Sequence, residues 1–68
     1  MNKEEMKAVL VRDLEYFSDR LIEEQRINNI TMINLITSRC TSVINFSVNI
    51  KIISLEEAEE LEKAYDLI

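Results

Sequence analysis

The sequence predicts an all-α domain of three helices, at about 3–26, 31–48 and 54–67, from three observations. Glycine and proline are absent, whereas tight hairpins and nucleophile elbows rely on glycine. Apolar residues recur at three- and four-residue spacing in both flanks, which indicates a buried helical face in each. Between the flanks, residues 27–53 carry only two charges, Arg39 and Lys51, so we expect the flanks to bury this middle segment.

The first predicted helix, at about 3–26, has a defined start and one apolar face. Asn2 can cap its N-terminus and Glu5 can reach back, which forms an approximate capping box. The apolar face consists of Met6, Val9, Leu10, Leu14, Phe17 and Leu21. We expect the helix to end at Asn28 and Asn29, because asparagine tolerates the left-handed conformation. Either Asn29 or Thr31 could then cap the second helix.

The middle segment can be interpreted in two ways. It is rich in Ile, Val and Thr, which favour strands, and residues 44–52 alternate apolar and polar. A helical projection over 32–49 instead places the apolar residues on one arc of roughly 220°. These residues are Met32, Ile33, Leu35, Ile36, Cys40, Val43, Ile44, Phe46 and Val48. The sequence therefore predicts a helix at about 31–48 and an extended connector at 50–53, with a strand or hairpin at 44–53 as the alternative.

The third predicted helix, at about 54–67, begins with a Ser-x-x-Glu capping box. Ser54 caps it, and Glu56 and Glu57 lie at the positive end of the helix dipole. Its apolar stripe consists of Leu55, Ala58, Leu61, Tyr65 and Ile68. The three helices together make a single small domain, 1–68.

The small size of the domain predicts association with another chain. A domain of this length buries only about 60% of the surface that its unfolded chain exposes, so its core is marginal. Cys40 is the only cysteine and there is no histidine, so neither an internal disulfide nor a zinc site can supplement the core. Two amphipathic helices can scarcely cover the wide apolar arc of the middle helix. We therefore expect a homodimer or a hetero-complex.

Charge and composition exclude several classes of protein. Residues 54–68 carry one basic and six acidic groups, and the whole chain has a net charge of −5. That balance disfavours direct nucleic-acid binding and binding to anionic membrane surfaces. No apolar run approaches the ~18–20 residues of a membrane span. The start resembles no signal peptide, so the expected location is the cytoplasm.

The sequence predicts no enzymatic activity. Histidine, the commonest general base, is absent, and Cys40 lies inside the apolar arc, where burial would raise its pKa. The carboxylates of the third helix lack the spacing and the glycine turn of an EF-hand loop. We therefore expect no catalytic residue, metal, cofactor or small-molecule substrate.

Two sets of polar residues are candidate interaction surfaces. The first is an interface on the middle helix: its uncharged polar strip, whose lack of charge fits a protein contact, supplies Asn34, Ser38, Thr41 and Asn45. Arg39, which falls within the apolar arc, joins this set because it could pair with an acid of a partner or of a second copy. The second is an acidic docking face on the third helix, made of Glu56, Glu59, Glu60 and Glu62. The polar strip could instead pack against a neighbouring helix. Arg39 could simply lay its aliphatic stem over apolar surface and expose its guanidinium group to solvent. The carboxylates of the third helix could form an ordinary solvated face.

The segment from Ile52 to Leu61, with sequence IISLEEAEEL, resembles the end of many small phage- and prophage-encoded helical proteins. Many of those proteins have a glycine before this motif, and here Asn49 is expected to replace it. The resemblance implies an accessory protein of a mobile element, a class that includes host-factor modulators and anti-CRISPR-type inhibitors. It transfers no functional residue.

These observations favour a non-catalytic interaction module that binds and modulates another protein, with inhibition favoured over activation. The alternative is a structural or assembly subunit that acts by self-association, which concentration-dependent higher oligomers would distinguish. An enzyme is the third possibility, and loss of an activity on Cys40→Ser would be needed to support it.

Overall fold

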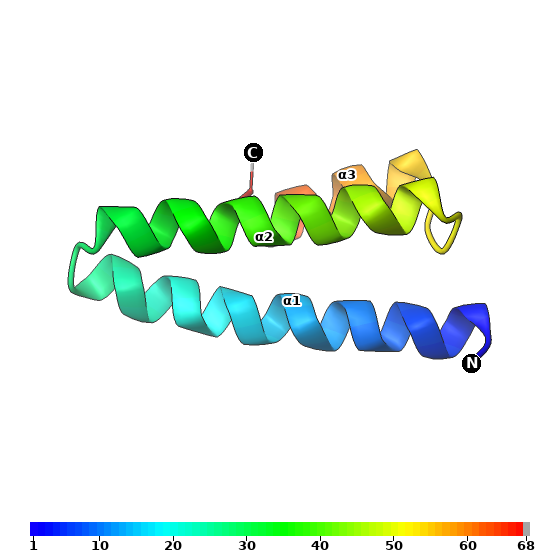
Figure 1. The fold of residues 1–68 in the computed structure, drawn as a ribbon, viewed down its shortest axis with the longest axis horizontal. Coiled ribbons are helices and arrows are strands. Elements are labelled where there is room, and N and C mark those ends of the chain that lie inside the picture. Colours follow the sequence, from blue (N-terminus) through cyan, green and yellow to red (C-terminus); the bar gives the residue numbers. More distant parts are fainter. Residues whose placement is uncertain (68) are drawn as a thin grey trace.

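The computed structural model describes residues 1–67, and this range contains three α-helices: α1 (Lys3–Arg26), α2 (Ile30–Asn49) and α3 (Leu55–Ala64). α1 and α2 lie side by side and antiparallel, and α3 runs back along α2, behind it in the view of Figure 1. The predicted three-helix class is therefore confirmed. The alternative of a strand or hairpin at 44–53 is wrong, because residues 44–49 belong to α2 and residues 50–53 form a turn.

The core lies between the three helices and follows the predicted apolar faces. Its buried members are Leu10, Leu14, Leu21, Ile36, Cys40, Ile44, Ile53 and Ala58. Leu14 and Ile44 are both 0% exposed and mark its centre. Cys40 is buried as predicted, and this burial raises the pKa of its thiol.

Each helix begins at a side-chain cap, as the sequence predicted. The Asn2 side chain accepts a hydrogen bond from the Glu5 N–H at 2.8 Å. Asn29, rather than Thr31, caps α2 and accepts from the Met32 N–H at 3.3 Å. At α3 both halves of the capping box form. These bonds satisfy N–H groups that have no partner within the helix.

The three described helices also end in one common way, a Schellman motif closed by a residue in the left-handed region. The left-handed residues are Asn28 (φ 56°), Lys51 (φ 63°) and Asp66 (φ 56°). In each case the next N–H donates to the carbonyl five residues back: Asn29 to Glu24 at 2.9 Å, Ile52 to Ser47 at 2.9 Å and Leu67 to Glu62 at 2.8 Å. Asn28 was predicted from its residue type, whereas the other two were not.

The same motif corrects three details of the sequence-based prediction. Lys51, not Asn49, takes the position that glycine would favour, and Asn49 is the last residue of α2. The connector 50–53 is a turn rather than extended, since Ile50 has φ −91° and ψ 9°. α3 ends at Ala64 instead of 67, because Asp66 reverses the backbone. The predicted stripe residue Ile68 lies outside the described residues.

Lys51→Gly is expected to stabilise the protein by about 1 kcal/mol. A side chain with a Cβ costs roughly 1–2 kcal/mol in the left-handed region, and the flexibility of glycine in the unfolded chain offsets part of the gain. Chemical denaturation at one fixed protein concentration measures the change. Asn49→Gly is the control, since at the last residue of α2 one weak helix former replaces another, and stability should fall by no more than about 0.5 kcal/mol. A Lys51→Gly protein no more stable than wild type would contradict the assignment.

Candidate functional site

A concave surface lined by polar and apolar side chains lies between α2 and α3. This groove, called the α2–α3 groove below, is lined by Asn45, Val48, Asn49, Leu55, Ala58, Glu59 and Glu62. Asn45 and Asn49 supply an uncharged side from α2, and Glu59 and Glu62 supply carboxylates from α3. Leu55 stands at one end of α3 and is 72% exposed. The groove therefore combines amide groups, negative charge and one exposed apolar side chain.

The α2–α3 groove joins part of each predicted interaction set. Asn45 comes from the uncharged strip, and Glu59 and Glu62 come from the acidic docking face. The antiparallel packing of α3 on α2 brings them together, although they are fourteen or more residues apart in the sequence. Because the sequence indicates which side of each helix is polar but not which polar sides adjoin, this groove was not predicted.

The remaining predicted residues lie elsewhere. Ser38 and Asn34 are exposed on α2, about two and three turns before Asn45, respectively. Thr41 is half-buried. Arg39 lines a groove between α1 and α2 instead. On α3, Glu60 faces α1, and Glu56 is exposed near the start of the helix. The two predicted sets are thus each divided between separate surfaces.

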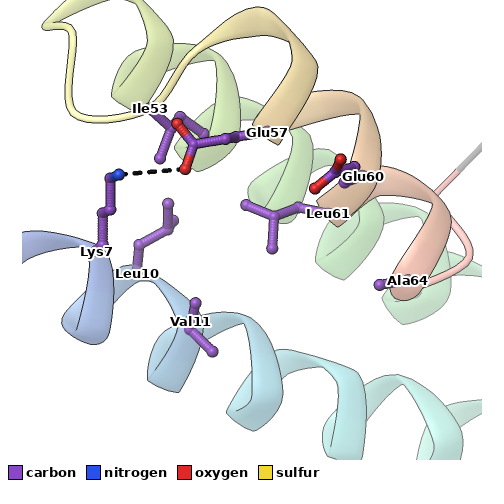
Figure 2. A pocket seen from close by; sticks show the side chains of 8 residues that line it. All are labelled: Lys7, Leu10, Val11, Ile53, Glu57, Glu60, Leu61 and Ala64. Atoms are coloured by element: carbon purple, nitrogen blue, oxygen red, sulfur yellow. Dashed lines mark ion pairs between the residues drawn. The ribbon is translucent and has the colours of Figure 1, made fainter. Parts of the chain in front are cut away.

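A second groove separates α1 from α3 and is closed at one end by an ion pair (Figure 2). Its lining residues are Lys7, Leu10, Val11, Ile53, Glu57, Glu60, Leu61 and Ala64. The Lys7 Nζ atom lies 3.2 Å from the Glu57 Oε2 atom. The Ser54 backbone N–H and the Lys7 side chain, both hydrogen-bonded to Glu57, lower the pKa of its carboxyl group. Lys7 was not singled out in the sequence, where nothing links it to a residue fifty positions away.

The lowered Glu57 pKa predicts a loss of stability in acid. A carboxyl group whose pKa is lower when folded stabilises the fold above its unfolded pKa, and this contribution disappears as the pH falls through the folded pKa. Glu57→Gln should therefore lower the thermal midpoint at neutral pH and leave it less sensitive to acid. Circular dichroism melts from neutral to acid pH measure this. Glu60→Gln, in the same groove, should keep the wild-type profile. Identical acid sensitivity in Glu57→Gln and wild type would refute the assignment.

The side of the α1–α2 pair opposite α3 is a third surface, called the open face below. It consists of Met6, Val9, Asp13, Tyr16 and Arg20 on α1 and of Leu35, Arg39 and Phe46 on α2. Leu35, Arg39 and Phe46 are four and seven residues apart, so they share one side of α2. No described helix covers this side, which faces the viewer in Figure 1.

Large apolar side chains remain exposed on the open face: Tyr16 is 59%, Leu35 44% and Phe46 62% exposed. The sequence placed Leu35 and Phe46 in the apolar arc of the middle helix and anticipated that two helices could not cover this arc. The structure locates the uncovered part of the arc on the open face, because α3 packs on the other side of α2.

The described residues form neither a metal-binding cluster nor a membrane-spanning helix. Among residues 1–67, no three His, Cys, Asp or Glu side chains come together in a way that could hold a metal ion. Nor does any helix in this range combine the length and the apolar character needed to cross a membrane. No family model matches the chain, and no curated protein or solved structure is significantly similar to it.

Proposed function

We propose that this chain is a non-catalytic interaction domain that binds another protein through the α2–α3 groove. The observation that carries this proposal is the meeting of Asn45 and Asn49 with Glu59 and Glu62 beside the exposed Leu55. Amide side chains both donate and accept hydrogen bonds, and carboxylates accept them from Lys and Arg. The partner surface that fits is therefore a basic segment with one apolar side chain near its end.

The dimensions of the groove limit the size of that segment. α3 has ten residues, which corresponds to a length of about 15 Å. A basic helix of three turns or an extended strand of about five residues would span it. The other acidic residues of α3 give this helix a net negative charge. That charge would attract the basic segment from a distance and speed the association of the two proteins.

The proposal extends to the biological class. The segment Ile52 to Leu61 resembles the end of small phage and prophage accessory proteins, and the chain shares their small size. We therefore propose an accessory protein of a mobile element that inhibits its target by occupying a basic functional surface. The second candidate, a self-associating subunit, is favoured by the uncovered open face.

The double variant Glu59→Gln/Glu62→Gln tests the groove. Tagged wild-type protein and variant are used to capture proteins from a lysate of the source cells, and the captured proteins are identified by mass spectrometry. A hydrogen bond to a charged group contributes about 1.5–3 kcal/mol, so the double variant should bind its target at least about tenfold more weakly. Added salt should weaken the wild-type complex in the same direction.

The matched control is Asp19→Asn/Glu23→Gln, which changes the net charge equally but lies on exposed positions of α1. The proposal requires that the control variant still capture a target protein that the groove variant loses. It also requires that this target, once purified, bind directly to the wild-type protein. Equal binding of that target to both double variants would overturn the role of the groove. Capture of no protein by wild type would count against the interaction function itself.

A further inference from the structure

We propose that the open face binds a second copy of this chain, in a two-fold dimer in which α1 of each copy lies over α2 of the other. This inference does not rest on the proposed function, because the open face and the α2–α3 groove lie on different sides of α2. It follows from the area, the charges and the apolar residues of the open face.

The area of the open face suits a dimer. A folded chain of 8.0 kDa typically exposes about 4,450 Å², whereas this one exposes 4933 Å². The molecule measures 38 × 20 × 16 Å, so the outline of its broad side is at most roughly 760 Å², comparable with the ~800 Å² of accessible surface that each partner buries in a stable complex. One copy therefore exposes more surface than is usual, and a second copy of the same size would cover it.

The charges of the open face are arranged for self-pairing. Asp13 lines the groove that contains Phe46, and Arg39 lines the neighbouring groove that contains Tyr16. Tyr16 follows Asp13 by about one turn of α1, so Asp13 and Arg39 flank the boundary between the two grooves, at the middle of the face. When the two-fold axis runs parallel to the helices, each position along the helix axis of one copy faces the same position along that axis in the second copy. Arg39 of each copy then lies within about one turn of both Asp13 and Arg20 of the other. The charge of Arg20 is already offset by a carboxylate on its own helix, so Arg39 pairs with Asp13, and this ion pair forms twice.

The apolar residues match in the same arrangement. Met6 and Val9 share a groove with Phe46, and Tyr16 shares the next one with Leu35. With α1 over the second copy's α2, Met6 and Val9 cover its Phe46 at one end of the face. Tyr16 covers its Leu35 at the other end. Aromatic and Arg side chains such as these commonly supply most of the binding energy of an interface.

The resulting assembly is a four-helix bundle in which α1 is antiparallel to both adjacent copies of α2. Opposed helix dipoles and short connections make this a common arrangement of helices. The two α3 helices, with their concentrated negative charge, lie on the two outer sides of the bundle, away from the shared face. Their mutual repulsion is therefore small, and both α2–α3 grooves stay accessible.

Charge reversal of the central pair tests this geometry. Asp13→Arg places two arginines at each contact, and Arg39→Asp places two aspartates there. Each single variant should raise the dissociation constant of the dimer at least about tenfold, as measured by light scattering and sedimentation over a concentration series. Asp13 and Arg39 are both exposed, so the fold should persist, which circular dichroism verifies. An equimolar mixture of the two single variants should restore the dimer, because every contact in it is again Asp with Arg.

Asp19→Arg and Arg12→Asp make the same exchanges at exposed positions of α1 outside the open face, and both should dimerise like wild type. Wild type that stays monomeric throughout the concentration series overturns the proposal. Single variants that dimerise as well as wild type, or a mixture that fails to pair, overturn the arrangement of α1 over α2. None of these results bears on the capture of a target through Glu59 and Glu62, so the two proposals fail separately.

Discussion

Leu14→Ala is expected to destabilise the protein by about 3–5 kcal/mol, the range found when a fully buried leucine is truncated. Leu14 is 0% exposed and lies at the centre of the core formed by α1 and α2. The loss combines the transfer energy of the removed methyl groups with the cavity that remains, because long helices collapse only partly around a gap. A domain of 68 residues typically has about 3–10 kcal/mol of stability, so this variant should be close to unfolded.

Urea denaturation of Leu14→Ala, followed by circular dichroism at one fixed protein concentration, measures this effect. The matched control is Leu55→Ala, the same chemical change at a side chain that is 72% exposed. That control should stay within about 0.5 kcal/mol of wild type. Similar unfolding free energies for the two variants would refute the placement of Leu14 in the core.

Ala58→Asp is expected to release α3 from α2, at a cost of about 3 kcal/mol or more. Ala58 is 4% exposed, and its small side chain lets α3 approach the core closely. An aspartate there would bury a carboxylate without a counter-charge. Once detached, ten residues are too few to remain helical alone, so the helical content should fall with the stability.

Amide hydrogen exchange of Ala58→Asp, combined with denaturation at neutral and acid pH, tests this expectation. Residues 55–64 should lose their protection, and the destabilisation should shrink in acid, where a protonated carboxyl group is less costly to bury. Ala8→Asp, at an exposed position of α1, controls for charge and helix propensity. Unchanged protection of α3 in Ala58→Asp would show that α3 does not pack through this residue.

The helices could be predicted because their signals are local. Side-chain caps at Asn2, Asn29 and Ser54 act within three residues, and apolar periodicity requires only the spacing of one helix. The middle segment was the hardest case, because its β-branched residues favour a strand, and burial of one helical side overrode that preference. The helix ends at Lys51 and Asp66 were not predicted, since lysine disfavours the left-handed region, and Asp66, whose residue type tolerates it, follows a continuous apolar stripe that predicts a longer helix.

The candidate surfaces could be predicted only in part. Residue type and period placed Asn45 on an uncharged side of one helix and Glu59 and Glu62 on an acidic side of another. Which sides adjoin depends on how α3 docks, and a helical projection contains no information about neighbours. Arg39 was assigned to the same interface as Asn45 although the projection placed it in the apolar arc, and the structure places it beside Tyr16 on the open face.

The sequence by itself determined three helices, the capping residues of the first and third, the apolar sides and the concentration of acid in the third. The tertiary structure decided which polar sides meet in the α2–α3 groove, that Lys7 pairs with Glu57, and which part of the wide α2 arc stays uncovered. The physical reason is the range of the interactions. Caps and periodicity act within one or two turns, whereas the position of α3 follows from burying Ile53 and Ala58 against residues on two other helices.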